Sequence, residues 1–145
     1  MNIKEKILGK RISGILNAVN ILLSLFCMIY YSVNANSVNE FNKAVDLYLA
    51  LTIVCCGIYV AADHIAADIC NLIAVVFITL SIGKMIVSSI NTFADALNGI
   101  SMFGSSGVIG YIIVTAVVMV IMLVLEIASC FMSRDRRDTI KVIAE

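Results

Sequence analysis

The sequence is short of charged residues, and it contains no proline or tryptophan. Charged residues make up 14% of the 145 positions and apolar residues 61%. A soluble domain has about 25% charged and roughly 45–50% apolar residues. A soluble fold of this size also leaves about 30% of the surface of the unfolded chain exposed to water. The composition, with a mean hydropathy of +1.04, therefore excludes an ordinary soluble domain and favours a chain that lies in a bilayer.

The cysteines do not have the spacing of a metal site or a disulfide framework. Their number is odd, no C-x-x-C occurs, and all lie in apolar runs: Cys27, Cys55, Cys56, Cys70 and Cys130. This pattern argues against both kinds of site, and the sequence has a single histidine. We expect the thiols to be small packing groups, and we expect no metal or other cofactor.

Motifs of enzymes are missing as well. The sequence contains no G-x-S-x-G, no H-E-x-x-H and no phosphate-binding loop. Redox enzymes that form disulfides at a quinone need paired thiols, whereas Cys55 and Cys56 are adjacent, so their side chains would diverge by about 100° on a helix. We expect a protein without enzymatic activity. The short basic tails give no support for nucleic acid as a partner.

Four apolar runs are long enough to cross a membrane as helices. The predicted spans cover residues 12–33, 44–64, 68–90 and 108–132. The first run corresponds to ~33 Å of helix, and the hydrocarbon core of a bilayer is ~30 Å thick. A signal peptide cleaved before Asn36 is the alternative for this run, although the apolar part of a signal peptide has only about 7–15 residues. The fold class predicted is an all-α bundle of four membrane-spanning helices.

The connections between the spans differ in length and character. Residues 34–43 and 91–107 are predicted as polar outer loops, and Asp68 is predicted to cap the third helix. In the longer loop, apolar residues recur at spacings of 4, 3 and 3, which is typical of a short helix in the membrane interface. These residues are Phe93, Leu97, Ile100 and Phe103.

The basic residues predict the orientation. Eight of the ten lie in the tails, residues 1–11 and 133–145. By the positive-inside rule, both tails are expected in the cytoplasm, which an even number of spans allows. We expect a plasma or inner membrane, and the abundance of Ile, Asn and Lys favours a bacterial source.

Polar and small residues form stripes on three spans. The first stripe has spacings of 4, 3, 4, 3 and 4, and the others have a similar period, as in left-handed helix packing. The first stripe is Ser13, Asn17, Asn20, Ser24, Cys27 and Tyr31; the second is Tyr48, Thr52, Cys55, Tyr59 and Ala62; the last includes Tyr111, Thr115, Met122, Glu126 and Ser129. The stripes are interpreted as the bundle interior, or alternatively as the lining of a polar path.

Ionisable residues within spans are candidates for functional groups. Asp63, His64, Asp68 and Glu126 are predicted to lie near one membrane boundary, where they could bind a proton or a cation. The alternative is a hydrated turn in which the aspartates cap helices. Asn17 and Asn20 are added to the candidate residues because an amide facing lipid would be costly.

These features lead to two hypotheses about function. The first is a non-enzymatic accessory or structural subunit of a membrane complex, with another membrane protein or a second copy as partner in the bilayer. The alternative is a small oligomeric transporter or channel for a proton, an ion or a small solute, with a path lined by Asn17, Asn20, Thr115 and Glu126.

Overall fold

The computed structural model of the chain describes residues 11–37, 39–61, 65–99 and 109–132. These residues form five helices, namely α2 (Arg11–Ser37), α3 (Lys43–Ala61), α4 (Ile65–Ser88), α5 (Ile90–Asn98) and α6 (Ile109–Met132). All except the short α5 are long and apolar enough to cross a membrane. The predicted all-α fold with four helices able to span a membrane is therefore confirmed.

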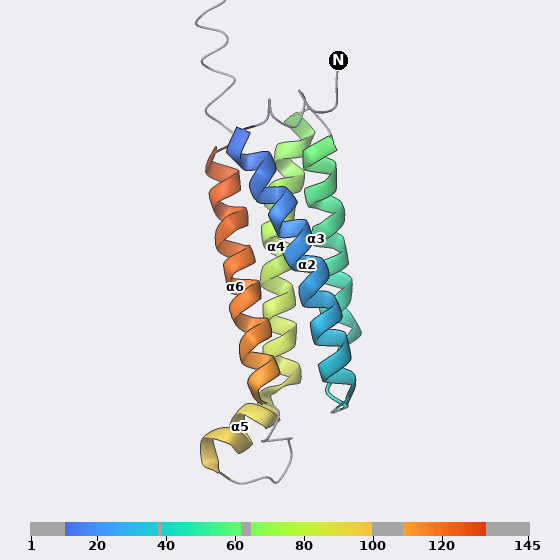
Figure 1. Cartoon of the computed structure of the whole chain (residues 1–145), viewed down its shortest axis with the longest axis vertical. Coiled ribbons are helices and arrows are strands. Elements are labelled where there is room, and N and C mark those ends of the chain that lie inside the picture. Colours follow the sequence, from blue (N-terminus) through green and yellow to red (C-terminus); the bar gives the residue numbers. More distant parts are fainter. Residues whose placement is uncertain (1–10, 38, 62–64, 100–108, 133–145) are drawn as a thin grey trace, which may run out of the picture.

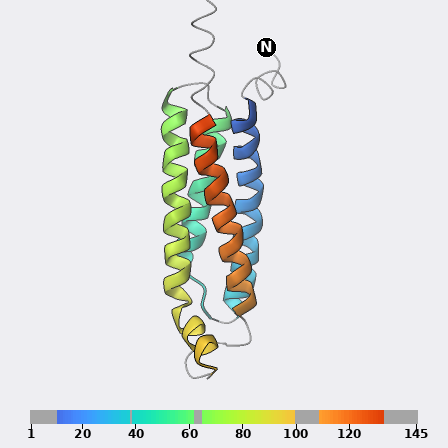
Figure 2. The same ribbon diagram turned by 90° about the vertical axis from the view of Figure 1, so that its left-hand side faces the viewer.

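The four long helices form an antiparallel bundle, and α5 lies beyond one end of it (Figure 1). Helix α2 packs against α3 and α6, and α4 packs against the same two helices. Figure 2 shows the same elongated arrangement from the side. Helix α2 begins and α6 ends at the same end of the bundle, which we call the tail end. The opposite end, where α5 lies, is called the α5 end.

Helix α2 is longer than predicted and takes up part of the expected loop 34–43. The helix continues to Ser37 and ends in a Schellman motif, because the N–H groups of Asn39 and Glu40 bond to the carbonyls of Asn36 and Ala35 at 3.4 and 3.0 Å. Asn39 has a φ of 59°, a left-handed conformation that asparagine tolerates better than most residues.

The start of α3 is fixed by a cap in the remaining loop. The side-chain oxygen of Asn42 accepts a 3.0 Å hydrogen bond from the N–H of Ala44. This is the N-cap interaction that satisfies one of the free donors at the beginning of a helix. The polar residues that predict a loop therefore cap the end of α2 and the start of α3.

Helix α4 begins earlier than predicted, so the expected cap at its start is wrong. The helix starts at Ile65, and Asp68 lies within its first turn. A carboxylate at this place still interacts favourably with the helix dipole.

The predicted helix in the longer loop is present but short. Helix α5 ends at Asn98, and Gly99 adopts a left-handed φ of 67° with its N–H bonded to the carbonyl of Asp95. Phe93 is half-buried and Leu97 is 85% exposed. The other two residues of the predicted pattern, Ile100 and Phe103, lie outside the described residues.

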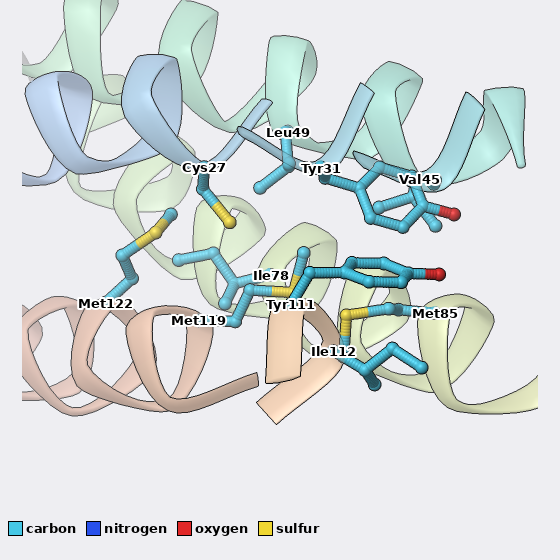
Figure 3. Packing of buried hydrophobic residues seen from close by; sticks show 11 residues of the cluster. Cys27, Tyr31, Val45, Leu49, Ile78, Met85, Tyr111, Ile112, Met119 and Met122 are labelled. Atoms are coloured by element: carbon cyan, nitrogen blue, oxygen red, sulfur yellow. The ribbon is translucent and has the colours of Figure 1, made fainter. Parts of the chain in front are cut away.

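The bundle interior towards the α5 end is mostly apolar, although Ser81, Ser89 and Thr115 are also buried there. Figure 3 shows the close packing of the buried side chains there, with Tyr31 and Tyr111 side by side. The cluster contains Cys27, Tyr31, Ala35, Val45, Leu49, Ile78, Met85, Tyr111, Ile112, Met119 and Met122. In lipid, such packing and interhelical hydrogen bonds hold helices together, because the hydrophobic effect does not. The apolar cluster therefore holds the four long helices together in this half of the bundle.

Candidate functional site

The interior towards the tail end is polar, and Glu126 is its only acidic side chain among the residues that the structure describes there. Glu126 lies on α6 and is fully buried. Its Oε2 accepts a 2.5 Å hydrogen bond from Nδ2 of Asn20 on α2. The thiol of Cys56 on α3 lies 3.7 Å from each carboxylate oxygen. Three helices thus meet at one carboxylate.

Asn17 and Asn20 are one helical turn apart on the same face of α2. Nδ2 of Asn17 donates to the carbonyl of Ser13 at 3.1 Å and to Oγ of Ser129 at 2.6 Å. Nδ2 of Asn20 donates to the carbonyl of Met122 at 3.2 Å as well as to Glu126. Both amides are fully buried, so they link α2 to α6 at two successive levels.

Hydroxyl groups extend this network to α3 and α4. Oγ of Ser13 lies 2.7 Å from the hydroxyl of Tyr59 and 2.7 Å from Oγ of Ser129. Nδ2 of Asn71 on α4 donates to Ser129 Oγ and to Cys130 Sγ, both at 3.3 Å. All four long helices therefore contribute to two hydrogen-bonded groups on neighbouring turns, one around Ser129 and one around Glu126, which together we call the polar cluster. It consists of Ser13, Asn17, Asn20, Cys56, Tyr59, Asn71, Glu126, Ser129 and Cys130.

The polar cluster ends where the apolar cluster begins. Ser24 is buried one turn beyond Asn20, and its hydroxyl has no hydrogen-bond partner among the described residues. Thr115 is also buried, but its hydroxyl donates to the carbonyl of Tyr111 in its own helix at 2.7 Å. Met119 and Met122 are fully buried between Thr115 and Glu126. Two methionines therefore separate Thr115 from Glu126 on the buried face of α6.

Only some of the predicted site residues lie together in the structure. Glu126, Asn17 and Asn20 come together in the polar cluster, whereas Asp68 is exposed on the first turn of α4. Asp63 and His64 lie outside the described residues. Within the described part of the chain, no group of three or more His, Cys, Asp or Glu side chains could hold a metal ion.

The stripe predictions succeed on α2 and are partly wrong on α3. All six residues of the first stripe are buried. On α3, Tyr48 and Cys55 are only half-buried, and Ala62 lies outside the described residues. The buried residues are Val45, Leu49, Thr52, Cys56 and Tyr59. The correct face has the same 4, 3, 4, 3 spacing, but it begins with two apolar residues. The polar residues of α3 alone therefore indicate the wrong buried face.

Two further polar residues were missed by the sequence reasoning. Asn71 stands alone in an apolar helix, so no stripe pointed to it. Glu40 precedes α3, and its carboxylate accepts hydrogen bonds from Thr92 on α5 and, at 2.8 Å, from the hydroxyl of Tyr111 on α6. The hydroxyl of Tyr31 accepts from the N–H of Asn42 at 3.1 Å. These bonds join the α2–α3 connection to α5 and α6.

Comparison with protein-family models, curated proteins and solved structures finds no match for this chain.

Proposed function

We propose that this chain is a non-enzymatic accessory or structural subunit of a membrane complex. One observation carries the proposal: the buried polar side chains link the helices of the bundle to one another, and the apolar cluster packs the interior towards the α5 end. The bond between Ser13 and Tyr59 joins α2 to α3, and the bond between Ser13 and Ser129 joins α2 to α6. A bundle with such an interior can act on other molecules chiefly through its outer surface.

The outer surface supports a function within the bilayer. Large apolar side chains are exposed on all four long helices, including Leu22, Val54, Leu72 and Val124. Lys84 is also exposed, four residues before the end of α4, where its long side chain can reach the membrane surface. Such a surface suits lipid and the helices of a partner protein.

The experiment that tests the proposal is purification of the tagged full-length protein in mild detergent at its native expression level. We expect a second membrane protein in fixed stoichiometry, and reciprocal purification through a tag on that protein should recover the same complex. A monomer or a homo-oligomer without a partner, found by mass determination in solution, would contradict the proposal.

The orientation belongs to the same proposal. We place the protein in the plasma membrane, or the inner membrane of a bacterium, with both tails in the cytoplasm, because eight of the ten basic residues are in the tails. A reporter enzyme that is active only outside the cytoplasm should be inactive when fused after Glu145. Activity of that fusion would overturn the orientation.

A second candidate function is a small oligomeric transporter for a proton, an ion or a small solute. The fully buried Glu126 favours it, since ionisable groups inside spans often mark ion pathways. A path would have to pass the apolar cluster through a second conformation or run between copies of the chain. Flux into vesicles that contain the purified protein should then be abolished by Glu126→Gln, and unchanged flux would exclude this role.

A further inference from the structure

We infer that Glu126, Asn17 and Asn20 form a binding site for a monovalent alkali cation such as sodium. This inference goes beyond the subunit proposal and does not depend on it, because the site lies inside one chain. It rests on the charge of the polar cluster and on its hydrogen-bond donors and acceptors.

Glu126 is fully buried, and the side chains that reach its carboxylate are a neutral amide from α2 and a thiol from α3. Lys43 and Lys84, the basic residues whose side chains the structure describes, are both exposed. A buried carboxylate without a positive partner is strongly unfavourable. One positive charge would make the site neutral.

The oxygens of the two buried amides also need a partner. Both Asn17 and Asn20 donate through Nδ2 to two acceptors, and one of the two is in each case a backbone carbonyl. A carbonyl can only accept a hydrogen bond, so rotating either amide by 180° would bring two oxygens together. The orientation of both amides is thereby fixed. Oδ1 of each is buried and has no hydrogen-bond donor among the described residues.

A proton and a metal cation are the two ligands that could satisfy these oxygens. A proton on Glu126 would supply one hydrogen-bond donor, which leaves at least one of the two amide oxygens without a partner. A cation coordinated by several oxygens can contact the carboxylate and both amides together. Carboxylate and amide oxygens are the ligands that hard cations prefer. Because Glu126 contributes one negative charge, a divalent ion would leave an excess buried charge, and the chemistry favours a monovalent ion.

The surroundings fit such a site. Ser13, Tyr59 and Ser129 provide hydroxyl groups on the side towards the tail end, from which an ion would enter. The apolar cluster lies on the other side and would stop the ion there. The geometry therefore points to a site reached from one end of the bundle.

Binding of radioactive sodium to the purified full-length protein in detergent tests the inference. We expect saturable binding that potassium competes for and that choline does not affect. Glu126→Gln, which keeps an acceptor for Asn20 but removes the charge, should abolish binding. Asn20→Ser should weaken it by about tenfold or more, as changes around a bound metal commonly do. Glu40→Gln makes the same chemical change at the α5 end and should leave binding unaltered.

Thermal unfolding provides a second measurement that also checks folding of the variants. Sodium chloride should raise the Tm of the unaltered protein above its value in choline chloride, since a ligand that binds the folded state stabilises it. The Tm of Glu126→Gln should not respond to sodium. If this variant does not fold, the sodium binding and Tm response of the unaltered protein decide the matter.

Several results would overturn the inference. These are the absence of saturable sodium binding, binding that persists in a folded Glu126→Gln variant, and binding of calcium in place of sodium. A protonated carboxylic acid band in the infrared spectrum that sodium does not alter would show that a proton alone occupies the carboxylate.

Discussion

Asn20 on α2 and Glu126 on α6 are 106 positions apart in the chain, yet they share a 2.5 Å hydrogen bond inside the bundle. The same amide donates to the carbonyl of Met122. Since Glu126 and Met122 are one turn apart on α6, a single asparagine contacts two successive turns of the facing helix. The pair therefore fixes the register of α6 against α2.

The first prediction is that Asn20 and Glu126 are energetically coupled. In sodium chloride, where a bound cation balances the charge of Glu126, Glu126→Met keeps a similar volume but leaves an N–H of Asn20 without its acceptor, which should lower the free energy of unfolding by about 1–3 kcal/mol. In the double variant with Asn20→Leu, the loss should be smaller than the sum of the two single losses, with a coupling of about 0.6–2 kcal/mol. Unfolding in mixed detergent measures all three. Additive losses would show that the pair contributes nothing as a pair.

The second prediction concerns Ser129, whose hydroxyl contacts Ser13, Asn17 and Asn71. Ser129→Ala removes the hydroxyl oxygen that links α6 to α2 and α4. We therefore expect a loss of about 1–3 kcal/mol in the free energy of unfolding.

Thr79 supplies the control for this prediction. It is exposed and bonds only within α4, to the carbonyl of Val75, so Thr79→Val should change stability by less than about 0.5 kcal/mol. Equal effects of the two substitutions would mean that the polar cluster adds no stability through its links between helices.

The third prediction concerns the α5 end. Glu40→Ala removes the acceptor of both Thr92 and Tyr111, so α5 should separate from the bundle more often. Backbone hydrogen exchange across residues 90–98 should become roughly tenfold faster, as expected for the loss of one to two hydrogen bonds. Tyr30→Phe, at a ring that stacks on Phe26, is the control. Unchanged exchange in Glu40→Ala would show that other contacts hold α5.

The fourth prediction separates the two adjacent thiols on α3. Cys56 is fully buried, whereas Cys55 is half-buried. In variants that keep only one of them, a small membrane-permeant thiol reagent should label Cys55 much faster, because reactivity requires access to the sulfur. Both should react alike after unfolding in strong detergent. Faster labelling of Cys56 in the folded protein would reverse the assigned face of α3.

The sequence alone predicts the number and type of the helices. Uninterrupted apolar runs must form helices in a bilayer, because no water is present there to satisfy the backbone. The run 108–132 agrees with α6 (Ile109–Met132) almost residue for residue. The polar stripe of α2 also identifies its buried face, since lipid excludes two asparagines from the outer surface. These conclusions need only the composition and the helical period.

Helix ends and the partners of each polar side chain depend on tertiary structure. The polar residues from Asn34 to Asn42 are compatible with a loop as well as with two caps, and the choice depends on hydrogen bonds to Ala35, Asn36 and Ala44. Cys55 and Cys56 satisfy a stripe of the same period, and only the packing of α3 against α2 and α4 decides which of them faces Glu126.

Sequence spacing therefore determined that Glu126 lies on an apolar helix and that Asn17 and Asn20 share a face. Only the antiparallel packing of α2 against α6 decided that Asn20 meets Glu126 and that Asn17 meets Ser129. The physical reason is that a helical period fixes which residues of one helix lie together, whereas the register between helices is set by close packing and by the need of buried polar atoms for partners.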